Sequence, residues 1–130
     1  MKISKLTGLV IIVILFYSCD PGRSGKTILN NQTSFSLELR YNTWSTDTFM
    51  IIPPKSSMEI YHIGGLGEGR DYDCCPCAFK EISLTVKDSN KTISKFITET
   101  NNWLLINENT KRYSNKEINC SFLLEQKDIQ

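Results

Sequence analysis

Three cysteines within four residues carry the clearest chemical signal in this sequence, in the run Cys74-Cys75-Pro76-Cys77. The outer two have the C-x-P-C spacing of a thiol–disulfide redox pair, in which a helix start lowers the pKa of the first thiol. That setting is missing, because the preceding segment is rich in glycine and no β-α-β pattern surrounds the motif. A zinc site needs four ligands, and only Cys120 and His62 could complete one. We therefore expect structural cysteines and keep redox chemistry as the alternative.

Disulfide bonds are the expected use of Cys74, Cys75, Cys77 and Cys120, because an even number of cysteines in an exported chain predicts pairing. A Cys74–Cys75 bond would strain the peptide between its partners, and a Cys75–Cys77 bond would close a very tight ring. The remaining full pairing joins Cys74 to Cys77 and Cys75 to Cys120. A single bridge from Cys120 to any one of the three loop cysteines is the other possibility.

No catalytic group is predicted. His62 is the only histidine, so any serine–histidine or cysteine–histidine mechanism would have to use it. It shares strand parity with Met58 and Ile60, which predicts a partly buried strand histidine with a hydrogen-bonded ring. Asp71 and Asp73 stand two residues apart but lack the spacing of an EF-type calcium loop. The sequence therefore predicts a protein that is not an enzyme and holds no metal and no cofactor.

The first 18 residues have the form of a secretory signal peptide. Lys2 and Lys5 precede an apolar run from about residue 6 to residue 17, and a small residue, Ser18, stands before Cys19. The run is about a dozen residues long, whereas a membrane-spanning helix needs roughly 20. We therefore expect export.

The Ser18-Cys19 ending resembles a bacterial lipobox, with Phe16 where leucine is usual. This resemblance implies that Cys19 becomes the first residue of the mature chain and carries a fatty acid such as palmitate, which attaches the protein to a membrane. The polar segment 20–26 reads as a flexible tether. We therefore divide the chain into a lipoprotein signal peptide (1–18), a tether (19–26) and one domain (27–126), located in the bacterial cell envelope, at the outer membrane or the periplasmic face rather than the inner membrane.

Length and charge limit the remaining classes. The chain has 130 residues, enough for one domain after the leader is removed. The leader holds two of its 15 basic residues and none of its 14 acidic ones, which leaves 13 against 14. A nearly neutral domain has no electrostatic footprint for nucleic acid.

Period-two alternation predicts strands along the whole domain. It is clearest at 35–41, 82–86 and 118–124, where one parity is apolar. Shorter strands are expected at 27–30, 48–52, 58–62 and 103–106, while 92–98 should pair back on 82–86 as a hairpin and 107–116 should be a polar loop. About seven short strands and no helical periodicity predict an all-β fold, a single antiparallel β-sandwich, with a small barrel as the alternative.

The two tryptophans have different expected places. Trp103 begins a predicted strand and should lie in the core. Trp44 stands in a polar turn, where an exposed aromatic side chain can anchor a carbohydrate or a protein. Packing over the edge of the sandwich is the more ordinary outcome, and it is the one we expect.

The chain resembles many small bacterial lipoproteins of unknown function. The resemblance rests on the leader, on Asn30-Asn31-Gln32-Thr33 before an alternating strand, and on the spacing of apolar residues from Ile118 to Ile129. It implies an Ig-like or transthyretin-like sandwich and carries no functional residue across. The expected function is a membrane-anchored, non-enzymatic binding or envelope-structural module whose partner is an unknown protein or glycan.

Overall fold

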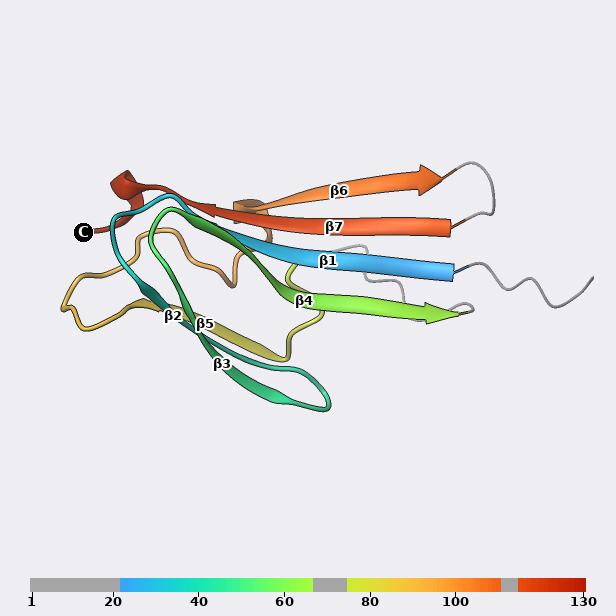
Figure 1. The fold of residues 1–130 in the computed structure, drawn as a ribbon, viewed down its shortest axis with the longest axis horizontal. Helices are drawn as coiled ribbons and strands as arrows, with labels where there is room; N and C mark the ends of the chain where they lie inside the picture. Colours follow the sequence, from blue (N-terminus) through green and yellow to red (C-terminus); the bar gives the residue numbers. More distant parts are fainter. Residues whose placement is uncertain (1–21, 67–74, 111–114) are drawn as a thin grey trace, which may run out of the picture.

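Two β-sheets form the domain in the computed structural model, which describes residues 22–66, 75–110 and 115–130. The larger sheet has the order β4-β1-β7-β6 and the smaller one β3-β2-β5 (Figure 1). The strands are β1 (Gly22–Asn31), β2 (Leu37–Asn42), β3 (Asp47–Ile52), β4 (Ser56–Leu66), β5 (Glu81–Val86), β6 (Trp103–Thr110) and β7 (Asn115–Leu124), with single 3-10 turns η1 (Thr100–Asn102) and η2 (Gln126–Asp128). The prediction of an all-β, sandwich-like fold is confirmed. Within these ranges no helix has the length and apolar character needed to cross a membrane.

The larger sheet is mixed, so the expectation of purely antiparallel sheets is wrong in one ladder. β1 pairs antiparallel with β4 but parallel with β7. Parallel neighbours need a long crossover connection. Here the crossover is nearly the whole domain, because the chain leaves β1, builds the smaller sheet and returns to place its last strand beside its first. The N-terminal end of β1 and the C-terminus consequently lie at opposite ends of the molecule (Figure 1).

β1 begins at Gly22, five residues before the predicted start of the domain. Residues 22–26, expected to belong to the flexible tether, instead pair with both β4 and β7. Gly25 explains how such a glycine-containing segment can be a central strand. A Cβ atom at this position would lie 2.7 Å from the backbone oxygen of Ile118 in β7, so the two strands approach more closely than any side chain allows.

Gly25→Ala is therefore expected to destabilise the fold by about 1 to 3 kcal/mol, because a backbone oxygen cannot move aside without shifting β7. Gly64→Ala is the matched control. A Cβ at Gly64, in β4, would meet only the His62 ring, at 3.7 Å, and we expect a change of less than about 0.5 kcal/mol. Urea denaturation of both variants measures the difference. Equal effects would contradict the close approach of β1 and β7.

The segment 92–98 is not a hairpin arm on β5, which corrects that prediction. Ile93 forms an isolated antiparallel bridge with Ile129, and Thr92 and Gln130 exchange two backbone hydrogen bonds of 2.9 Å. Residues 127–130 consequently belong to the domain, beyond the predicted boundary at residue 126. β6 and β7 also extend into the predicted polar loop, to Thr110 and from Asn115.

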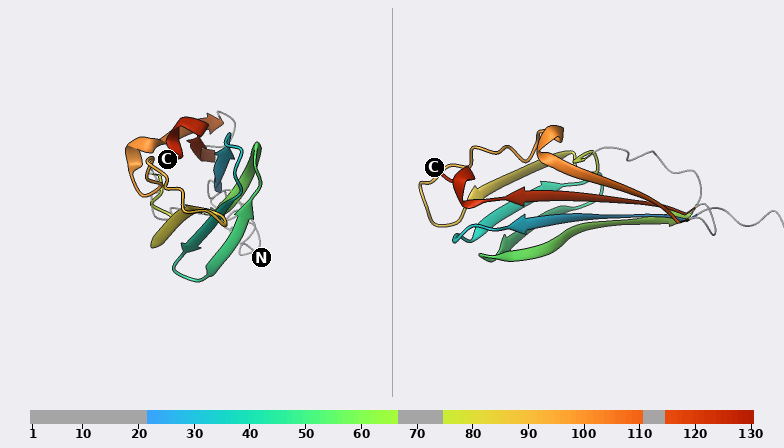
Figure 2. Two further views of the ribbon diagram at one scale, coloured as in Figure 1. Left: turned by 90° about the vertical axis from the view of Figure 1, so that its left-hand side faces the viewer. Right: turned by 90° about the horizontal axis from the view of Figure 1, so that it is seen from above.

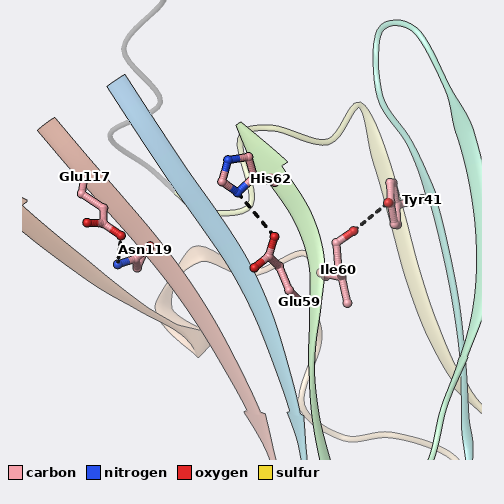
Figure 3. Close-up of polar contacts among 6 residues, drawn as sticks. All are labelled: Tyr41, Glu59, Ile60, His62, Glu117 and Asn119. Atoms are coloured by element: carbon pink, nitrogen blue, oxygen red, sulfur yellow. Dashed lines mark hydrogen bonds and ion pairs between the residues drawn. The ribbon is translucent and has the colours of Figure 1, made fainter. Parts of the chain in front are cut away.

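The core lies between the sheets, where the predicted inward parity is confirmed. Its fully buried apolar side chains are Leu29, Leu37, Leu39, Ile52, Phe122 and Leu124. Trp103 is buried as expected; its ring centroid lies 5.2 Å from that of Phe122, and its Nε1–H donates to the Ile97 oxygen at 2.7 Å. A hydrogen bond joins the two sheets directly, since the Tyr41 hydroxyl of β2 donates to the Ile60 oxygen of β4 at 2.7 Å (Figure 3).

Candidate functional site

Trp44 stands at the tip of the β2–β3 hairpin and is 73% exposed, so the expectation that it packs over the sandwich edge is wrong. The buried anchor of this four-residue loop is Thr43. Its backbone N–H donates to the Thr46 oxygen at 2.8 Å, and its hydroxyl accepts from the Thr46 N–H at 3.1 Å. Because Thr43 provides the internal contacts of the turn, the neighbouring indole is left in solvent.

Arg40 and Phe49 lie beside each other on the outer face of the smaller sheet. They are directly opposite in the β2–β3 ladder, and the guanidinium carbon lies 5.0 Å from the ring centroid. Phe49 is 53% exposed. A cation held over an aromatic ring at this distance is attracted to the ring face. The pair therefore gives this face a mixed apolar and cationic character.

A row of polar side chains crosses the same face between this pair and the hairpin tip. Asn42 is opposite Asp47 on one side and Glu81 on the other, and its amide donates to the Asp47 carboxylate. Asp47 and Glu81 are both exposed. We call the whole group the Trp44 surface; it consists of Arg40, Asn42, Trp44, Asp47, Phe49 and Glu81.

Two shallow hollows adjoin each other on the Trp44 surface, with volumes of about 490 and 290 Å³. The larger one is lined by Arg40, Phe49 and Glu81, the smaller one by Trp44 and Lys80, and Asn42 and Asp47 line both. Aromatic rings can stack on an apolar ligand face, while the amide and charged groups can bind hydroxyl or charged groups beside it. This arrangement suits binding.

The Cys75–Cys120 disulfide predicted from the sequence is confirmed. The two Cα atoms are 5.9 Å apart, and both side chains are buried. Cys77 is exposed and is also disulfide-bonded. Cys74 and the predicted lipidation site, Cys19, lie outside the described residues, so the Cys74–Cys77 pairing and the lipid remain predictions.

His62 is exposed rather than partly buried, because a β-bulge at Ile60 reverses the faces of β4. Thr27 pairs with Tyr61 and the next residue of β1 pairs with Glu59, which leaves Ile60 as the extra residue. Beyond the bulge Tyr61 turns inward, and His62 turns outward with 52% of its side chain exposed. Its Nδ1 lies 3.4 Å from the Glu59 carboxylate (Figure 3).

The polar side chains on the outer face of the larger sheet do not converge on one point. Figure 3 shows His62 and Glu59 on β4, and Asn119 and Glu117 on β7, with β1 between the two pairs. Within the described ranges no three His, Cys, Asp or Glu side chains are placed to hold a metal ion together. Asp71 and Asp73 fall in the segment 67–74, which the structure does not describe.

The sequence did not identify Arg40 and Phe49 as surface partners. Alternation in 35–41 places Arg40 on the outer face, since its neighbours Leu39 and Tyr41 point inward. Residues 49–52, by contrast, are Phe-Met-Ile-Ile, an unbroken apolar run in which neither parity is polar. Only the register with β2 shows that Phe49 faces outward.

Comparison of the chain with protein-family models, with curated proteins and with solved structures gives no match in any of the three. A function for this chain therefore has to be argued from its own residues, and the Trp44 surface is the site that they favour.

Proposed function

We propose that this chain is a bacterial envelope lipoprotein, attached through a lipid on Cys19, whose β-sandwich is a non-enzymatic binding module that contacts its partner through the Trp44 surface. The observation that carries the proposal is the exposure of Trp44 and Phe49 on one side of the smaller sheet. Tryptophan and arginine are the residues most enriched among those that dominate binding energy at interfaces. Trp44 leaves 73% of its surface in solvent beside the exposed Phe49, which makes aromatic surface available to a partner.

The disulfide chemistry agrees with an exported protein. A buried Cys75–Cys120 bond persists in an oxidising compartment such as the periplasm or cell surface. The thiol–disulfide alternative concerns Cys74 and Cys77, and its reactive thiol would need a helix start beside it. Residues 75–80 form bends and turns and no helix. We therefore favour structural cysteines over a redox function.

The finer fold type is also part of the proposal. In a constant-type immunoglobulin domain the first, second, fifth and fourth strands share one sheet. Here the first strand shares its sheet with β4, β7 and β6. Because this order differs from the Ig-like one, we propose the transthyretin-like type of the two that the resemblance implies.

The anchor is tested with the native full-length protein. We expect it to partition into detergent, to incorporate labelled fatty acid and to begin at Cys19 by mass spectrometry. The mass should show more than one acyl chain, because a single chain binds a membrane only reversibly. Cys19→Ser should yield soluble protein or an uncleaved precursor. A native protein that is soluble and carries an unmodified N-terminal Ser18 or Cys19 would refute the anchor.

The binding site is tested by Trp44→Ala. We expect binding to the native partner, recovered by cross-linking on intact cells or from a glycan array, to weaken at least about tenfold, because an interface aromatic anchor commonly contributes 2 kcal/mol or more. The melting temperature should stay unchanged, since the indole has few contacts to lose.

Leu104→Ala is the matched control for this experiment. Leu104 is also an exposed apolar residue, 60% exposed, but it lies in β6 of the other sheet. His62→Ala adds a check on catalysis. If a folded His62→Ala protein lost all function, the non-enzymatic proposal would fail, and equal losses in Trp44→Ala and Leu104→Ala would remove the Trp44 surface as the site.

A further inference from the structure

β5 presents an open edge. Within residues 22–66, 75–110 and 115–130 it pairs only with β2, and Figure 2 shows it as an edge strand of the smaller sheet. The Lys87 N–H donates to the Ser36 oxygen at 2.9 Å, so the odd-numbered residues of β5 direct their backbone groups toward β2. The backbone groups of Ile82, Leu84 and Val86 then point away from it. Among the described residues none of these three backbones has a hydrogen-bond partner outside the β2–β5 ladder.

We propose that two copies of this chain associate through this edge, with their β5 strands antiparallel about a two-fold axis at Leu84. The pairing places Leu84 opposite the second copy's Leu84 and Ile82 opposite its Val86. It joins the backbone groups that point away from β2 and extends the three-stranded sheet to six strands. A two-fold contact of this kind uses the same surface on both chains and closes on itself.

The side chains on both faces agree with this register. Ile82, Leu84 and Val86 alternate with Ser83 and Thr85, so apolar residues meet on the inner face while Ser83 meets Thr85 on the outer one. Residues directly opposite each other in an antiparallel pair share a face. Sliding one β5 strand along the other by one residue would therefore place apolar side chains opposite polar ones, so only slides of two residues are allowed. A slide of two residues in either direction leaves fewer residues paired.

Charge selects among the allowed registers. In the proposed one Glu81 lies opposite the second copy's Lys87, and the same pair occurs again at the other end. Within one chain these two residues are six positions apart along a strand, about 20 Å, too far to interact. Among the described residues the Lys87 ammonium has one carboxylate contact, a loose one with Asp88 at 3.8 Å, and the Asp88 side chain is 84% exposed. Opposite charges at cross-strand positions stabilise a ladder, and like charges destabilise it.

A groove beside the edge leaves room for the inner-face side chains of an added strand. It has a volume of about 350 Å³ and is lined by Leu84 of β5 and by Ile93 and Phe96 of the following segment. Phe96 is 58% exposed and would be partly covered. The axis stands perpendicular to the sheet, so a dimer would present two Trp44 surfaces on one face. That last consequence rests on the proposed function, whereas the dimer itself does not.

A charge exchange tests the register. The full-length protein in detergent is studied by sedimentation velocity from micromolar to near-millimolar concentration, with a non-reducing gel to exclude intermolecular disulfides. We expect a reversible dimer. Glu81→Lys and Lys87→Glu should each weaken it by about tenfold, because each creates two like-charge pairs. The double variant Glu81→Lys/Lys87→Glu should restore it to within about threefold.

Glu38→Lys is the matched control, since Glu38 lies on the same outer face but in the central strand β2, opposite Thr85. It should leave the dimer unchanged. A protein that is monomeric at every concentration, or a dimer that ignores both single changes, overturns the proposal. A Glu38→Lys effect as large as that of Glu81→Lys would also overturn it, because net charge would then be the cause.

Cross-linking gives a second measurement that does not depend on charge. Ser83→Cys and Thr85→Cys proteins are mixed and treated with a short bis-maleimide, and the products are identified by mass spectrometry. We expect the 83-to-85 product in the mixture and much less product from either variant alone, with the wild type as background. Equal yields from each variant alone would overturn this register.

Discussion

Removing the Cys75–Cys120 disulfide is expected to lower the free energy of unfolding by about 4 kcal/mol. The bond closes a loop with a sequence separation of 45 residues, and the value follows from the loop-closure entropy that the cross-link removes from the unfolded chain. A domain of this size is commonly stable by about 5 to 15 kcal/mol, so the loss is a large fraction of the total. The melting temperature should fall by roughly 20 °C.

The measurement compares Cys75→Ala, Cys120→Ala and the double variant by urea denaturation of the oxidised proteins. Both residues act through one bond, so the double variant should lose little more than either single one. Two independent, additive losses would instead indicate cavities left by the two buried side chains. A Cys120→Ala protein that melts like the wild type would contradict a stabilising role for the bond.

The strands near the core could be predicted from the sequence because each has one face in the interior. In 35–41 and 118–124 the inward residues are apolar and the outward ones mostly polar, and the structure buries Leu37, Leu39, Phe122 and Leu124 as that pattern requires. Burial on one face is a local signal, carried by every second residue. The same parity placed Cys120 inward, where it meets Cys75.

Pairing between distant strands is not a local signal, and it accounts for the errors in the fold. Nothing in residues 22–26 shows that they lie beside β7, since the close approach at Gly25 depends on the backbone of Ile118. The bulge at Ile60 is similarly invisible, because an extra residue in one strand is defined only by its partner. That bulge reversed the expected face of His62.

The candidate site was only partly visible in the sequence. Trp44 could be singled out because a large aromatic residue in a polar turn is unusual, but its exposure depends on Thr43 taking the buried place in the hairpin. Arg40 and Phe49 come together only through the β2–β3 register. Exposed residues are less constrained by local pattern than buried ones.

Asn31→Ala is expected to destabilise the domain by about 3 kcal/mol, although no charge and little apolar area are lost. Asn31 ends β1 and is fully buried. Its amide donates to the oxygens of Phe35 and Pro53, at 2.8 Å each, and its Oδ1 accepts from the Thr33 N–H at 3.0 Å and the Thr33 hydroxyl at 2.7 Å. Both N–H donors of this amide are used, and removing the side chain leaves its buried partners without these hydrogen bonds.

The four contacts place Asn31 at a junction of the two sheets. Thr33 and Phe35 belong to the crossover from β1 to β2, and Pro53 belongs to the turn between β3 and β4. Asn30→Ala is the matched control. Asn30 has the same side chain one position earlier, but within the described part of the chain its side chain makes a single hydrogen bond, to the Ser121 hydroxyl at 2.9 Å. We expect it to cost about 1 kcal/mol.

Asn31→Asp separates hydrogen bonding from shape, because the two side chains have nearly the same size. A carboxylate would keep the two bonds from Thr33 but would face the oxygens of Phe35 and Pro53 with no proton to donate. Burial and these oxygens favour the protonated acid, so its pKa should be higher in the folded than in the unfolded chain. The folded state then binds more protons, and the free energy of unfolding falls as pH rises through the unfolded pKa toward the folded one.

Urea denaturation at two pH values tests this linkage. We expect the difference in the free energy of unfolding between Asn31→Asp and the wild type to be smaller at pH 4 than at pH 7, whereas the difference for Asn31→Ala should stay constant. A difference for Asn31→Asp that does not change with pH would show that the side chain at this position reaches solvent and that the network is not what secures the crossover.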